Sequence, residues 1–101
     1  MLATDIQVAR VVSVAALATE GVHAMGRGRY VEAATYDGAE KVSGVVVDPE
    51  KVEVHVVVRW PLPKPIPEIA GSIRERIVPQ VGGRRTIIMV DDLEVGADEN
   101  L

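Results

Sequence analysis

Two histidines and an aspartate pair are the side chains of this chain that could do acid–base or metal chemistry. His55 follows Glu53 on the polar side of an alternating stretch, and His23 has no partner within sequence reach. A metal site needs three or four converging ligands, and His55 with Glu53 supplies two. Asp91 and Asp92 are neighbours in an expected strand, so their side chains point to opposite faces and share no site. We therefore interpret His55 as an ordinary exposed histidine and both aspartates as solubilising residues at a strand end.

The serines and glycines form no catalytic or phosphate-binding motif. No serine lies in the sharp turn that exposes a nucleophile. The glycines at Gly26, Gly28 and Gly82-Gly83 lack the spacing of a P-loop or a dinucleotide fingerprint. The chain also has no cysteine, which excludes a thiolate metal site. The sequence therefore predicts no enzyme and no cofactor.

Length and composition predict one small domain over residues 1–95, followed by an acidic tail over residues 96–101. The 101 residues are 48% hydrophobic, with one Trp, two Tyr and no Phe, so the core must be built from aliphatic side chains. A net charge of −4 argues against a general nucleic-acid binder. The sequence contains no apolar run of the roughly 18 residues that a membrane span needs and no basic leader. We expect a cytoplasmic protein.

The clearest structural unit is an antiparallel hairpin, with strands at residues 42–47 and 52–58 joined by a turn at Asp48–Lys51. Valines alternate with polar residues along its second strand, so one face is buried and the other is wet. A capping box at residues 4–7 opens a first helix, which Gly21 ends. Residues 25–29 read as a loop, and residues 29–36 as a short edge strand.

The second half adds a helix and a strand. The prolines at positions 61–67 end the hairpin, and an amphipathic helix follows over residues 66–81, with Pro79 in its last turn. Residues 86–95 form a final strand that is apolar on both faces, which predicts a central place in the sheet. The fold class is α+β: a small, mostly antiparallel sheet with two helices packed on one face. We expect the other face to be partly bare.

Candidate contact residues fall into two groups. Trp60 is a residue type that is favoured at interface hot spots, although it could instead cover the core, and the proline link beside it is stiff. The weak strand at residues 29–36 offers unpaired backbone groups to another copy. The candidate protein-contact residues are therefore Tyr30, Val31, Trp60, Pro61 and Pro63. The alternative is a small RNA-binding module that uses the loops "GRGR" and "GGRR", through Arg27, Arg29, Arg84 and Arg85. The strands lack the aromatic residues that stack bases, so nucleic acid is the less favoured partner.

The order of motifs resembles the alkaline shock protein family of Gram-positive bacteria, also called the envelope stress response family. The motifs are Ala15-Ala16, then Gly21-Val22 and Met25, then Gly44-Val45-Val46-Val47 and an alternating valine strand, then Ile66, Ile69-Ala70, Ile73 and Ile77, and a last strand that ends at Asp92-Leu93. The resemblance spans residues 3–93. It implies a non-enzymatic cytoplasmic protein that gathers beneath the membrane through a small membrane-anchored partner, is linked to cell-envelope stress and self-assembles in some members. It implies no catalytic or cofactor residue and no small-molecule substrate.

Overall fold

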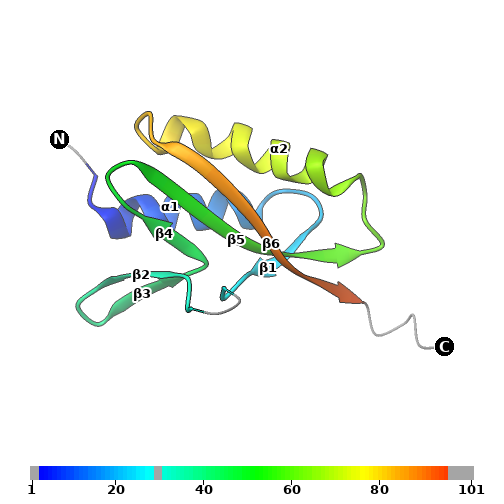
Figure 1. Ribbon diagram of the computed structural model, residues 1–101, viewed down its shortest axis with the longest axis horizontal. Helices are drawn as coiled ribbons and strands as arrows, with labels where there is room; N and C mark the ends of the chain where they lie inside the picture. The colour runs from blue at the N-terminus through cyan, green and yellow to red at the C-terminus, as the bar shows by residue number, and fades with distance from the viewer. Residues whose placement is uncertain (1–2, 29–30, 96–101) are drawn as a thin grey trace.

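The computed structural model shows a four-stranded mixed sheet with both helices on one face and a separate two-stranded ribbon beside it (Figure 1). The structure describes residues 3–28 and 31–95. The elements in chain order are α1 (Asp5–Leu17), β1 (Val22–Met25), β2 (Ala34–Asp37), β3 (Glu40–Ser43), β4 (Val45–Val47), β5 (Lys51–Trp60), α2 (Ile66–Ile77), the 3-10 helix η1 (Val78–Gln80) and β6 (Arg85–Val95). The prediction of an α+β fold with two helices on one face of a small, mostly antiparallel sheet is confirmed. No helix in the described part of the chain combines the length and the apolar character that crossing a membrane requires.

The core lies between the sheet and the two helices. The capping box predicted at the start of α1 is present: the Gln7 amide donates to Thr4 Oγ1, and the Thr4 amide donates to Gln7 Oε1. The even-numbered valines of β5 face this core and are fully buried, as the alternation predicts. Opposite them lie the buried faces of the helices, made by Val8, Ala9, Val12 and Ala16 of α1 and by Ile69, Ile73 and Ile77 of α2. The second helix ends at Ile77 and continues as η1, where Pro79 breaks the α-helical pattern as expected.

The central strand is β5, and the prediction that the last strand is central is wrong. β5 pairs antiparallel with β1 and β4 on one side and parallel with β6 on the other, along its whole length. In the part of the chain that the structure describes, β6 pairs with no other strand, so it is an edge. The apolar residues on its two faces have different surroundings. Ile88 and Val90 pack on the core, whereas Met89 lies on the opposite face of the sheet.

The predicted hairpin is present as β4 and β5, but its first strand is interrupted at Gly44. The turn is as expected, because Asp48 Oδ1 accepts the amides of Glu50 and Lys51, each at 2.8 Å. Gly44 has a positive φ of 85°, and a Cβ there would lie 2.7 Å from the Met25 Cβ. The chain therefore changes partner at this glycine: β3 pairs with β2, and β4 pairs with β5.

Two further predictions before the hairpin need correction. Residues 22–25, expected to lie in or next to a loop, form β1 and pair with the end of β5. His23 has a partner there, because Arg59 Nη2 lies 2.9 Å from its Nδ1. The strand predicted at residues 29–36 begins instead at Ala34, where it pairs with β3. Of that predicted strand, Arg29 and Tyr30 lie outside the described residues, and Val31 lies in a bend.

Candidate functional site

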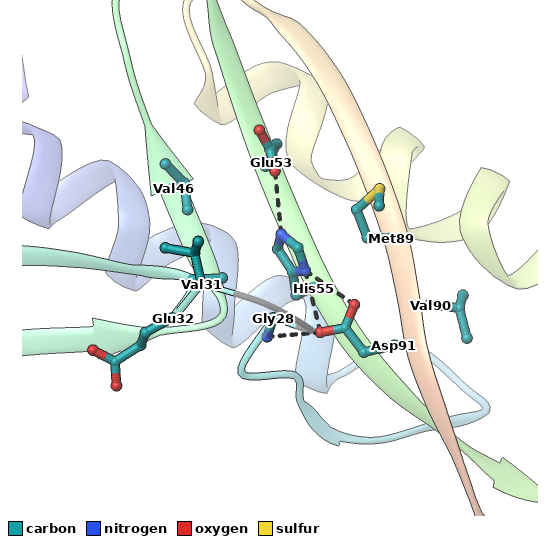
Figure 2. A pocket seen from close by; sticks show the side chains of 10 residues that line it. Gly28, Val31, Glu32, Val46, Glu53, His55, Met89, Val90 and Asp91 are labelled. Atoms are coloured by element: carbon teal, nitrogen blue, oxygen red, sulfur yellow. Dashed lines mark hydrogen bonds and ion pairs between the residues drawn. The ribbon is translucent and has the colours of Figure 1, made fainter.

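A pocket of about 680 Å³ lies on the face of the sheet opposite the helices (Figure 2). Its floor comes from β4, β5 and β6, and one wall comes from the segment between β1 and β2. Ten described residues line it: Gly28, Val31, Glu32, Ala33, Val46, Glu53, His55, Met89, Val90 and Asp91. The face of the sheet that was expected to be partly bare therefore forms a pocket.

His55 lies in the floor of this pocket, and its interpretation as an exposed histidine is wrong. The residue is 8% exposed, and its ring is held at both nitrogens (Figure 2). Nδ1 lies 3.0 and 3.1 Å from the two carboxylate oxygens of Asp91, and Nε2 lies 3.2 Å from Glu53 Oε1. Burial is possible because both polar atoms of the ring have partners. A neutral imidazole has one N–H, so only the protonated ring donates to both carboxylates at once.

Asp91 lies in the middle of β6 as a partly buried hydrogen-bonding group, with its side chain 10% exposed, which corrects the prediction of a solubilising strand end. The β5–β6 register pairs Val56 with Val90 and Val57 with Asp92, so Asp91 is the extra residue of a bulge. Its Oδ2 accepts the Gly28 amide at 2.9 Å and thereby fixes the wall segment to the floor. At Gly26 this approach is so close that a Cβ would lie 2.4 Å from Asp91 Oδ2.

The prediction that Asp91 and Asp92 point to opposite faces is wrong, because the bulge puts Asp92, the partner of Val57, on the same face of the sheet as Asp91; only Asp91 lines the pocket. Asp92 is exposed, and its Oδ1 accepts the amide of the next residue at 2.8 Å. One local feature of the sequence points to this cluster, namely a histidine inside a run of valines. The pairing of His55 with Asp91, 36 residues further along the chain, results from the strand order and the bulge. No local sequence pattern indicates either of these.

Glu53 is the most accessible group of the cluster, with its side chain 26% exposed. Burial raises the pKa of Glu53, but hydrogen bonds from His55 and Lys51 outweigh burial and hold the pKa below its ordinary value. Lys51 Nζ lies 3.2 Å from Glu53 Oε2. Glu53 is therefore a carboxylate at neutral pH, at the side of a largely apolar hollow.

The chemistry that the pocket can do is limited by its lining. The described lining residues include no hydroxyl or thiol side chain that could act as a nucleophile. Among residues 3–28 and 31–95, no group of three or more His, Cys, Asp or Glu residues could hold a metal ion. The arrangement can bind through its carboxylates and its apolar walls.

The candidate protein-contact residues lie in two places. Trp60, at the end of β5, is 47% exposed and does not cover the core; Pro61 and Pro63 follow it and are exposed as well. Trp60 is in register with Val95 of β6, which is also exposed, as is Leu93. Val31 is exposed at the pocket wall, and Tyr30 lies outside the described residues.

The arginines of the RNA alternative do not form one patch. Arg27 lies near Glu32 and Lys41, beside the β2–β3 ribbon. Arg84 and Arg85 lie at the start of β6, where the Arg85 amide donates to the Glu50 carbonyl. Gly28 is fixed to Asp91, six residues along β6 from Arg85, which is roughly 20 Å at the rise of a strand. Arg29 is not among the described residues.

Comparison of the chain with protein family models, with curated proteins and with solved structures finds no match.

Proposed function

We propose that this protein is a non-enzymatic module of cell-envelope stress response and homeostasis, which acts by self-assembly and by binding a membrane-anchored protein partner at the inner face of the cytoplasmic membrane. The resemblance to the alkaline shock protein family motivates the biological setting. One observation carries the mode of action: the eleven residues of β6 leave one edge of the sheet unpaired in the described part of the chain. An unpaired edge presents a row of N–H and C=O groups on which another strand can add.

The charges along β6 favour a second copy of this chain as the added strand. The strand begins with Arg85 and carries Asp92 and Glu94 near its end. Arg85 and Asp92 lie on one face of the sheet, because their β5 partners Lys51 and Val57 are an even number of residues apart. When two copies of β6 pair antiparallel about a two-fold axis, the basic start of each lies beside the acidic end of the other.

The exposed apolar end of the sheet is the surface for a different partner. Trp60, Leu93 and Val95 lie together where β5 and β6 run to their ends, and Pro61 and Pro63 follow directly. Tryptophan on a rigid strand end is a typical hot-spot residue, because it buries a large area with little loss of side-chain entropy. This cluster supports the proposal of a protein partner that is held at the membrane.

A charge exchange tests the self-association. Light scattering of the unaltered protein should give a mass above the 10.8 kDa of the monomer that rises with concentration. Arg85→Glu places like charges together twice in the symmetric pair and should weaken association roughly tenfold. Combining it with Asp92→Arg should restore association, whereas Arg76→Glu on α2, which changes the net charge equally, should have little effect. A monomer at millimolar concentration, or equal masses for Arg85→Glu and Arg76→Glu, would overturn this assembly mode.

The setting in the cell needs a separate experiment. A fluorescently tagged copy in the native host should gather at the cell periphery, and Trp60→Ala should release it into the cytoplasm if the apolar end binds the partner. A diffuse signal that envelope stress leaves unchanged would contradict the proposed function.

RNA binding remains the alternative to a protein partner. It is less favoured because Arg27 lies far from Arg84 and Arg85 along the sheet. It predicts a low-salt gel shift at micromolar protein, lost with Arg84→Ala and steeply weakened by salt.

A further inference from the structure

We propose that the pocket on the open face of the sheet binds a small organic amine, with its apolar body against the valines and Met89 and its ammonium group at Glu53. This site goes beyond the proposed function, because it uses the face of the sheet rather than its edge or its apolar end. It also differs from the expectation that the protein takes no small molecule.

The size and the walls of the pocket suit an apolar body. A volume of about 680 Å³ lies within the range of small-molecule sites. Val31 and Val46 line one side and Met89 the other (Figure 2), and Ala33 adds to the apolar lining. The Met89 side chain adapts to different shapes. Such a surface gains free energy when a hydrocarbon or aromatic group displaces water from it.

The polar groups of the lining require a ligand that donates hydrogen bonds. Apart from His55, the ionisable residues in the described lining are all carboxylates, namely Glu32, Glu53 and Asp91, and the Glu32 carboxylate is paired with Lys41. Each oxygen of Glu53 has one hydrogen-bond or ion-pair partner, to His55 and to Lys51 respectively, and each can accept a further bond. An ammonium group beside Glu53 would therefore make charge-assisted hydrogen bonds without displacing either partner.

An anionic ligand fits poorly for the same reason. Among the described lining residues the only basic group is the His55 ring, and both of its nitrogens already face Asp91 or Glu53. A ligand carboxylate or phosphate would have to lie beside the carboxylates of Glu53 and Asp91, and the described part of the lining includes no lysine or arginine. The charge of the lining thus selects against acids as well as for amines.

The cluster is also held in place before any ligand arrives. His55 bridges a β5 carboxylate and a β6 carboxylate, and Asp91 fixes the Gly28 amide of the wall. These contacts come from three separate segments, so the acceptors need little rearrangement on binding. Preorganisation of this kind lowers the entropic cost of binding.

Three probes of one shape test the inference: 2-phenylethylamine, the neutral 2-phenylethanol and the anionic 3-phenylpropionate. In an NMR titration of the unaltered protein at pH 7, the amine should cause saturable shifts at Glu53, His55 and Met89, with a dissociation constant on the order of 1 mM for a ligand of this size. The alcohol should bind about tenfold more weakly, and the carboxylate should not saturate. The inference fails if the amine does not saturate by about 10 mM, or if all three probes bind equally.

Two variants then test whether the ammonium group of the ligand binds at Glu53. Glu53→Gln should remove the preference for the amine over the alcohol, whereas Glu75→Gln, at an exposed position of α2 on the other side of the sheet, should retain the preference. An unchanged preference in Glu53→Gln would overturn the assignment to Glu53. The amine should leave the light-scattering mass of the protein unchanged, so failure of this site and failure of the proposed assembly are separate results.

Discussion

The two faces of β5 are stabilised by different kinds of interaction, although they belong to the same ten residues. The even positions Val52, Val54, Val56 and Val58 are fully buried against the helices. The odd positions Lys51, Glu53 and His55 carry charge or a titratable ring, and they hold the floor of the pocket through ion pairs and hydrogen bonds. Non-directional hydrophobic packing stabilises the first face, whereas the stability of the second depends on the positions of a few polar atoms.

This difference decides what each face tolerates. A hydrophobic core accepts changes of shape and loses free energy roughly in proportion to the volume removed. A buried polar cluster loses free energy when one partner is left without its hydrogen bond, whatever the volume. Substitutions on the two faces should therefore differ in size and in their dependence on pH.

The largest effect is expected on the helix-covered face. Ile73→Ala removes a fully buried side chain of α2 from the core and should lower the free energy of unfolding by about 3 kcal/mol. Ile66→Ala, at the exposed start of the same helix, should cost less than about 1 kcal/mol. Urea denaturation followed by circular dichroism measures both. Similar losses for the two variants would mean that α2 is not packed as described.

A smaller loss is expected in the polar cluster. Asp91→Asn keeps the shape of the side chain but replaces one acceptor oxygen with a donor, which faces either His55 or the Gly28 amide. We expect a loss of about 2 kcal/mol in the free energy of unfolding, from a buried group left without a suitable partner. The neighbouring exposed change Asp92→Asn should stay within about 0.5 kcal/mol. If both changes cost the same, Asp91 contributes no more than a surface carboxylate.

The same two faces explain which parts could be predicted from the sequence. The valine alternation, the capping box and the isoleucine stripe of α2 are local patterns, and they correctly predicted both helices, the β4–β5 hairpin and the buried face of β5. The polar cluster depends on β6 pairing parallel to β5 and on a bulge at Asp91, which are properties of the assembled sheet. The break at Gly44 was missed for a similar reason, because the close contact with Met25 that requires a glycine is a tertiary contact.

The pH dependence of stability sharpens the contrast further. The pKa of Glu53 is lowered in the folded protein, so its contribution is present above the unfolded pKa, near 4.3, and is lost as the pH falls through the folded pKa. The stability difference between the unaltered protein and Glu53→Gln, about 1 kcal/mol at pH 7, should shrink steadily below about pH 4.5. Urea denaturation at several pH values measures this, and a difference that stays constant down to pH 3 would contradict it.

The smallest effect is expected at Val31, and it separates two models of self-association. This residue is 81% exposed, lies in a bend rather than in a strand and therefore offers no ladder to another copy. Val31→Ser should change the free energy of unfolding by less than about 0.5 kcal/mol and leave the light-scattering mass unchanged. It should weaken binding of 2-phenylethylamine modestly, because it removes part of the apolar wall of the pocket. If Val31→Ser instead lowers the mass while Arg85→Glu does not, copies meet at the wall segment before β2, as the sequence alone suggested, and the edge of β6 is not the contact.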